Sequence, residues 1–305
     1  MLFLALAVCA SLGIAVVFKV AERRDLDRTA LLTVNYAAGA VLAAALQGIG
    51  EAQAVTAGLA LLGAAQGVLF IAGFWLFAYA IRLAGMGLAT GVMRLSVVVP
   101  VLASWAIWAE APSALQLGGL ALAGGAFFLV ARPAAEPPGK LGPPADGTRP
   151  GGGAAAPERG RVLLVLALLF ASGGCVDVLN KAFAEQYADA VSPSLFILFV
   201  FGVAFAVGVA VIAAQGARGG GWPDRAALGW GAGLGLLNYA SVDFLLRALA
   251  VLDGPFVFPA NSVAIVLGAA LLGSVVWRER LSRANLAGLA LASVALVLLT
   301  WGTAA

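Results

Sequence analysis

Apolar stretches of about twenty residues follow one another along almost the whole of the 305-residue chain. An α-helix needs a stretch of about this length to cross the roughly 30 Å hydrocarbon core of a membrane. Backbone amides left unpaired in lipid are costly, and these stretches are too long and too uniformly apolar for barrel strands, so we expect helices. The sequence therefore predicts an all-α integral membrane protein. Ten transmembrane helices are expected, at residues 2–20, 30–48, 57–80, 86–108, 114–131, 162–184, 194–214, 226–249, 256–277 and 285–302.

The composition excludes several classes of function. Hydrophobic residues make up 62% of the chain and charged residues only 11%, which leaves no room for a soluble catalytic domain. Histidine is absent, and the cysteines, Cys9 and Cys175, both lie inside apolar stretches, so we expect no metal, no cofactor and no cysteine framework. We set aside an intramembrane enzyme, because no histidine, metal cluster or pair of catalytic acids supports one. The net charge of +3 lies in the loops and indicates membrane topology, not nucleic-acid binding.

One segment interrupts the apolar pattern. Residues 132–161 contain seven of the 13 prolines and seven glycines, and such a segment buries too little surface to fold. We interpret it as a disordered linker. It divides the chain into a first repeat of five helices, residues 1–131, and a second repeat of five helices, residues 162–305.

A sixteen-residue motif occurs once in each predicted repeat. WAEAPSALQLGGLALA begins at Trp108 and WRERLSRANLAGLALA begins at Trp277, with nine of sixteen positions identical. Because each repeat has an odd number of helices, the second should enter the membrane inverted relative to the first. The loop charges agree, since basic residues gather after the first predicted helix and after the ninth. By the positive-inside rule, the odd-numbered loops are cytoplasmic and both termini face outward.

Five residues of the loops and helices carry local structural predictions. Ser113 and Gln116 form a capping-box pattern at the start of the fifth predicted helix, and Ser282 takes the same place before the tenth. Pro100 and Pro259 lie inside the fourth and ninth predicted helices, where proline predicts a kink. The abundant glycines indicate close helix packing in lipid.

Ten helices in two halves, with Trp277-Arg278-Glu279-Arg280-Leu281-Ser282 before the last helix, resemble the drug/metabolite transporter superfamily in its EamA-like branch. Glu110-Ala111-Pro112-Ser113 is a degenerate first copy of that signature. The resemblance implies transport of small metabolites, often outward, by alternating access through a cavity between the halves. It also implies a multi-pass protein of the bacterial inner membrane. The signature lies at a turn between helices, so we interpret it as a cap and turn and look for the working residues elsewhere.

The candidate binding residues are polar side chains inside the apolar stretches, where a charge needs a reason to be buried. Arg94 is the clearest, because it lies deep in its helix without an acid nearby. Asp177–Lys181 and Asp243–Arg247 have the spacing of ion pairs along a helix, which leaves open whether they serve only to neutralise each other. The full set is Arg94, Asp177, Asn180, Lys181, Asn238, Tyr239, Asp243, Arg247 and Asn261, with Trp75 as a possible wall residue that more often would only pack.

Counted along its helix, Arg94 lies at a different depth in the membrane from Asp177 and Asp243. A direct contact between the arginine and either acid would therefore need a tilt or a kink. With two acids against three bases, the expected lining is net positive and favours an anionic or zwitterionic metabolite, such as an amino acid, a carboxylate or a phosphorylated compound. The main hypothesis is a secondary-active exporter or exchanger that acts as a monomer or homodimer, with a proton or a second metabolite as coupled partner. A lipid-linked phosphate flippase, a multidrug exporter of the same fold and a non-transporting scaffold remain open.

Overall fold

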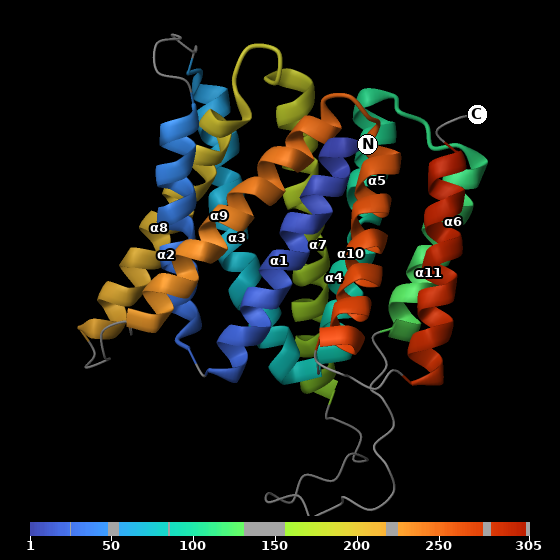
Figure 1. Ribbon diagram of the computed structural model, residues 1–305, viewed down its shortest axis with the longest axis horizontal. Coiled ribbons are helices and arrows are strands. Elements are labelled where there is room, and N and C mark those ends of the chain that lie inside the picture. Colours follow the sequence, from blue (N-terminus) through green and yellow to red (C-terminus); the bar gives the residue numbers. More distant parts are fainter. Residues whose placement is uncertain are drawn as a thin grey trace, which may run out of the picture.

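The computed structural model describes residues 1–24, 26–47, 55–84, 86–130, 156–217, 225–276 and 282–302, and within these ranges it contains α-helices and no strands. The helices form one bundle in which α8 and α9 are the most tilted (Figure 1). The predicted all-α class is confirmed for this part of the chain. The helices are α1 Leu2–Arg23, α2 Arg28–Leu46, α3 Ala57–Ala84, α4 Met86–Leu95, α5 Val98–Trp108, α6 Ala114–Val130, α7 Ala156–Gln186, α8 Pro193–Gly216, α9 Arg225–Leu249, α10 Gly254–Val276 and α11 Arg283–Trp301.

Within the described residues, 8 helical segments are long and apolar enough to cross a membrane. One of them, Ala89–Trp108, runs through both α4 and α5. The apolar part of α6, Ala114–Leu129, is shorter, and α9 is long but is diluted by Asn238, Asp243 and Arg247. The protein is therefore a multi-pass membrane protein by the length and composition of its helices.

The fourth predicted helix is broken in two near its middle. Val97 N donates to Arg94 O at 3.4 Å and Val99 N donates to Ser96 O at 2.9 Å, so the chain tightens to a three-residue turn between α4 and α5. Pro100 has no N–H to give to the carbonyl of Ser96, and proline is tolerated only in the first turn of the helix that follows. The kink predicted at Pro100 thus takes the form of a break, whereas α10 continues through Pro259.

The two copies of the repeated motif begin their helices with the predicted caps. Ser113 N donates to Gln116 Oε1 at 2.8 Å, and Gln116 N donates to Ser113 Oγ at 3.3 Å. Ser282 and Asn285 form the same reciprocal capping box at the start of α11. Each box satisfies two of the amides that a helix start leaves without partners. The signature residues 277–281 lie outside the described residues.

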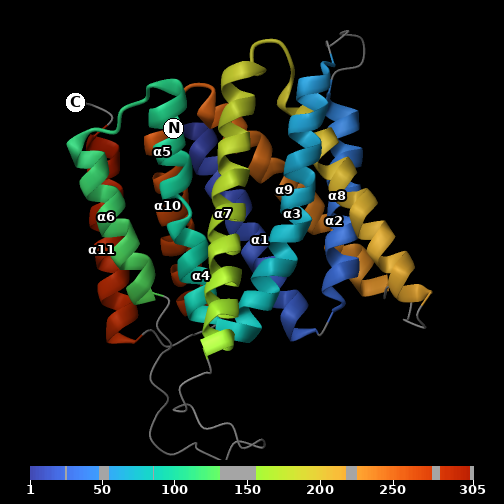
Figure 2. The ribbon, with the colours of Figure 1, turned by 180° about the vertical axis from the view of Figure 1, so that it is seen from behind.

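Both ends of the helical chain lie on one side of the bundle. α1 begins there and α11 ends there, whereas α6 ends and α7 begins on the opposite side (Figures 1 and 2). α1 and α7, the first helices of the two predicted repeats, therefore run in opposite directions. Of the predicted linker 132–161, residues 132–155 lie outside the described residues, and α7 begins at Ala156, earlier than expected.

Most of the extensive contacts join helices from different halves of the chain. α9 packs on α1 and α2, and α3 packs on α7 and α8. α10 contacts α1, and α5 contacts α7. Three further pairs, α2 with α8, α5 with α10 and α6 with α11, connect the halves directly. The core is consequently shared, with no separate core for each half.

Glycines allow the closest of these approaches. A Cβ added at Gly67 of α3 would lie 2.4 Å from Val200 O of α8, and one added at Gly235 of α9 would lie 2.4 Å from Asn35 O of α2. Gly63 and Gly231, four residues earlier in each case, face the same partner helices. Helix backbones meet at these places, as is common where small residues pack in lipid. The predicted packing role is thus confirmed at these glycines.

Candidate central binding cavity

A cavity of about 360 Å³ lies among the middle portions of seven helices, α1, α2, α3, α4, α7, α9 and α10. This is the size range of pockets that take small organic molecules. Much of the wall is apolar, with the rings of Phe18, Tyr36, Phe70, Phe74 and Phe77. The polar side chains on the wall are Asn35, Arg94, Ser96, Ser172, Asp177, Asn238, Asn261 and Ser262.

Arg94 and Asp177 lie on this wall close enough for their charges to interact. We expected a cavity with Arg94 at one level and the acids at another, and Arg94 and Asp177 do lie on the wall of one cavity. α4 ends at Leu95, one residue after Arg94, so the break between α4 and α5 sets where the arginine lies. No direct ion pair joins Arg94 to Asp177 or to any other carboxylate among the described residues. Both charged groups therefore remain able to bind a ligand in the cavity.

Two glycines on α7 bring Asp177 close to the break. A Cβ added at Gly173 would lie 2.8 Å from Ser96 Oγ, and one added at Gly174 would lie 2.4 Å from Val99 Cβ. α7 therefore packs with its bare backbone against the turn that joins α4 to α5. Asp177 follows Gly173 by one helical turn and so reaches the same cavity as Arg94.

Two asparagines on the cavity wall, one on α2 and one on α9, bond each other. Asn238 Nδ2 donates to Asn35 Oδ1 at 3.2 Å. Asn35 Nδ2 is buried without a hydrogen-bond partner, and so is Asn261 Oδ1 on α10. Buried polar atoms without partners are rare because each forfeits its bonds to water. A polar ligand in the cavity would therefore find one free hydrogen-bond donor and one free acceptor on the wall.

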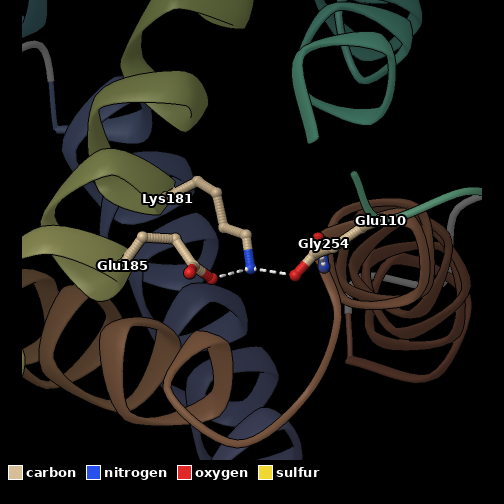
Figure 3. A network of polar contacts seen from close by, with 4 residues as sticks. All are labelled: Glu110, Lys181, Glu185 and Gly254. Atoms are coloured by element: carbon tan, nitrogen blue, oxygen red, sulfur yellow. Dashed lines mark hydrogen bonds and ion pairs between the residues drawn. The ribbon is translucent and has the colours of Figure 1, made fainter. Parts of the chain in front are cut away.

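Lys181 does not form the ion pair with Asp177 that their spacing would allow. Its Nζ lies 2.5 Å from Glu110 Oε1 and 2.6 Å from Glu185 Oε1, and Figure 3 shows the lysine between these two carboxylates. Its side chain is only 1% exposed, and it is not part of the cavity wall. Because Lys181 is neutralised by other acids, Asp177 is left to face the cavity.

The other predicted binding residues also lie away from the cavity wall. Asn180 accepts a bond of 2.7 Å from Gln66 Nε2. The Tyr239 hydroxyl bonds Ser194 Oγ at 2.6 Å. Arg247 and Asp243 form the predicted pair along α9, with bonds of 2.7 and 3.2 Å, and Trp75 packs against the aromatic core around Phe201.

Sequence reasoning missed three kinds of residue. Asn35 was passed over, although a buried amide in an apolar helix is the same kind of signal as Asn180, Asn238 and Asn261. Glu110 was interpreted only as part of a turn, because its partner Lys181 is 71 positions away in the sequence. Ser96 and Ser172 complete the cavity wall, and short hydroxyl side chains in membrane helices give no distinctive pattern.

The polar side chains of this cavity can bind a ligand through hydrogen bonds and ion pairs. Among the described residues, no group of three or more His, Cys, Asp or Glu side chains is placed to hold a metal ion. The fold and the cavity define an all-α, multi-pass membrane protein with a polar, charged binding cavity at its centre.

Two known proteins resemble this chain, one in sequence and one in fold. No family model matches the sequence. An uncharacterized protein of Haemophilus influenzae is 26% identical over 228 residues, which cover 74% of this chain and 70% of the relative. A protein of known crystal structure superposes with a TM-score of 0.71 and covers 98% of both chains at 16% identity. At that identity, the similarity shows a shared fold.

Proposed function

We propose that the chain is a secondary-active transporter of a small polar metabolite, either anionic or zwitterionic, that works as an exporter or exchanger. The observation that carries the proposal is the presence of Arg94 and Asp177 on the wall of one central cavity without a direct ion pair. An arginine in the membrane costs at least about 2.5–3.5 kcal/mol on insertion scales, so a structure that leaves it exposed to a cavity needs a functional reason.

The lining suits a molecule with a carboxylate or phosphate group. The guanidinium of Arg94 presents parallel N–H donors that match two oxygens of such a group. Asp177 can accept bonds from an ammonium or hydroxyl group on the same molecule. Asn35 Nδ2 and Asn261 Oδ1 add one neutral donor and one neutral acceptor. A purely hydrophobic cation would leave Arg94 without an anion, which disfavours it as cargo.

We further propose that the helices form two inverted repeats of five membrane crossings, α1 to α6 and α7 to α11, with α4 and α5 as one crossing. The contacts support this relation, since most inter-half pairs, though not α6 with α10, have a counterpart after the halves are exchanged. α1 with α9 corresponds to α7 with α3, and α1 with α10 corresponds to α7 with α5. The glycine pairs Gly63 and Gly67 on α3 correspond to Gly231 and Gly235 on α9. The opposite directions of α1 and α7 agree with inversion (Figure 1).

This architecture suits alternating access. Inverted repeats can exchange their conformations, so that a cavity at their interface opens first to one side and then to the other. The cavity is lined by helices of both proposed repeats, as such a mechanism needs. The bacterial relative is consistent with a place in a bacterial inner membrane.

A ligand screen by thermal unfolding tests the proposal. Purified protein is heated with amino acids, dicarboxylates, sugar phosphates, nucleotides and hydrophobic cations, one at a time. A ligand at one hundred times its dissociation constant stabilises the folded protein by about 2.7 kcal/mol, which is measurable as a higher melting temperature. We expect anionic or zwitterionic compounds to raise it.

Three variants locate the binding site. Arg94→Gln should abolish the shift with every such compound, and Asp177→Asn should abolish it with zwitterions while sparing dianions. Arg247→Gln is the matched control, because this arginine also lies in a membrane helix but is 44% exposed and away from the cavity. A screen without any shift, or an Arg94→Gln protein that keeps it, would refute the proposed site.

A further inference from the structure

Lys181 lies at the centre of a buried ionic network at one end of the cavity. Figure 3 shows its Nζ between Glu110 and Glu185, at 2.5 and 2.6 Å from the nearest carboxylate oxygens. Glu185 is on the same helix as the lysine, whereas Glu110 follows the C-terminal end of α5. The bond to Glu110 therefore joins two helices that come from different halves of the chain.

Glu110 also holds a third helix. Its Oε2 accepts a bond of 2.9 Å from Gly254 N, at the N-terminal end of α10. A carboxylate suits this place, because the first amides of a helix have no partners within the helix. The approach is close: a Cβ added at Gly254 would lie 2.2 Å from Ser104 Oγ of α5. Glu110 thus ties the ends of α5, α7 and α10 together.

The network lies between the cavity and one face of the bundle. On α7, Lys181 follows the cavity residue Asp177 by one turn, in the direction of the end where the chain termini lie (Figures 1 and 2). The neighbouring residue Asn180 bonds Gln66 of α3, which adds a second buried link between the halves at the same level. A path from the cavity past these two links would require α7 to separate from α3 or α5.

On the opposite face, the two halves are joined by contacts between arginines and aromatic rings. Arg24 lies over the ring of Trp230, and Arg161 lies over the ring of Tyr79, so each of these pairs also joins the two halves. Both arginines are exposed to solvent. Contacts of this kind are weak in water, whereas a buried ion pair cannot be opened by removing one partner without a large cost. The ion pair between Lys181 and Glu110, which joins the halves, lies on the side of the chain termini.

We propose that Glu110 and Lys181 form the gate latch that closes this face of the cavity, an inference that rests on the proposed alternating-access function. Glu185 makes the latch reversible. When α5 moves away, Lys181 keeps a carboxylate one turn along its own helix and is never left as a lone buried charge. Glu185 is 35% exposed, so the lysine can follow it toward water as the gate opens.

This role predicts opposite effects for two substitutions, each of which removes one of the two carboxylates that pair with Lys181. Glu110→Gln removes the ionic link between helices but keeps an oxygen for Gly254 N, so it should favour the open gate. Glu185→Gln removes the alternative partner, so it should keep Lys181 on Glu110 and the gate closed. A purely structural network would be weakened by both.

Distances between spin labels measure the gate directly. Cys9 and Cys175 are exposed and are first replaced by serine. Labels are then attached to cysteines placed at Ile107, which is 63% exposed near the end of α5, and at Gln186, which is exposed at the end of α7. Pulsed electron paramagnetic resonance on protein in lipid nanodiscs gives the distance distribution between them.

We expect one predominant short distance in the parent protein, with any longer distance a minor population of about a tenth or less. Glu110→Gln and Lys181→Met should each make the longer distance the main one, and Glu185→Gln should not. The latch is wrong if Glu110→Gln leaves the distribution unchanged or if both glutamine variants lengthen it alike. The measurement needs no cargo, so a gate that opens in a protein without transport would separate failure of the function from failure of the latch.

Discussion

Lys181 has a carboxylate one helical turn away on each side, Asp177 before it and Glu185 after it, yet it pairs with only one of them. Glu110 determines this pairing, because it bonds the lysine from the connection that follows α5. Since both of its partners lie away from the cavity, the lysine leaves Asp177 unpaired beside Arg94. At the scale of single residues, the charged cavity and the buried network are thus two consequences of one side-chain orientation.

Ala109 carries a testable local strain. It joins α5 to Glu110 with φ 58°, the positive-φ non-glycine residue of the described chain. A Cβ in this left-handed region costs roughly 1–2 kcal/mol, which glycine avoids. We expect Ala109→Gly to raise the free energy of unfolding by up to about 1 kcal/mol, the remainder being offset by the greater freedom of glycine in the unfolded chain. Thermal unfolding in detergent gives the measurement.

Ala111→Gly is the control for that substitution. Ala111 lies two residues further along the same exposed connection, and its φ is not positive. Glycine there adds freedom to the unfolded chain without relieving strain, so the melting temperature should fall. If Ala109→Gly lowers it as much as Ala111→Gly does, the left-handed conformation is not a source of strain.

The sequence indicated which polar residues lie in the membrane but not which of them meet. Arg94, Asp177, Asn238 and Asn261 do line the cavity. Asn180, Lys181 and Tyr239 bond partners far along the chain, such as Gln66 for Asn180. Spacing along one helix predicts contacts within that helix, as between Asp243 and Arg247. It does not show which neighbouring helix a side chain reaches, because that depends on packing between segments remote in sequence.

At the scale of elements, apolar length and turn chemistry predicted the helices well. The capping boxes at Ser113 and Ser282 were predicted because their spacing is local. Proline at position 100 marked the interruption near Arg94, although its form, two helices and a tight turn, depends on which backbone bonds the chain makes instead. Close packing between helices was foreseen only in general, since glycines occur on both packed and open surfaces.

The glycine contacts make a prediction about one helix pair. Gly67→Ala would place a Cβ 2.4 Å from Val200 O, so α3 and α8 must separate. Overpacking of this kind costs about 1–3 kcal/mol, which should lower the melting temperature by several degrees. Gly202→Ala on α8 is the matched control, because a Cβ there has no atom within 4 Å. Equal melting temperatures for the two variants would show that α3 and α8 do not pack as tightly as described.

At the scale of the whole molecule, charge differs between the two faces. The charged residues at helix ends and in the described loops are mostly basic on one face and mostly acidic on the other, with Glu22, Asp27 and Glu158 as exceptions on the first face and Arg247 on the second. On the face where α1 ends and α7 begins lie Arg23, Arg24, Arg28, Arg161 and Arg283, and on the other face lie Glu110, Glu185, Asp189 and Asp253. The positive-inside rule predicts that the first face is cytoplasmic, which is the orientation expected from the loops.

Labelling from one side of the membrane tests this orientation. In a background without Cys9 and Cys175, single cysteines replace Asp189 on one face and Arg23 on the other, both exposed positions. A maleimide that does not cross membranes should label the Asp189→Cys protein in intact bacterial spheroplasts. It should label the Arg23→Cys protein only after the membrane is permeabilised. The reverse pattern would invert the proposed topology and place the Glu110–Lys181 network on the cytoplasmic face.

The central claim is that a small anionic or zwitterionic solute binds beside Arg94 and crosses the membrane through this cavity. Solute flux in proteoliposomes tests it most directly, with the radiolabelled form of whichever screened compound gives the largest thermal shift. We predict saturable uptake or exchange by the parent protein and by Arg247→Gln, and a loss to the level of protein-free liposomes for Arg94→Gln. Flux through Arg94→Gln equal to that of the parent protein, or none above protein-free liposomes for the parent, would contradict the claim.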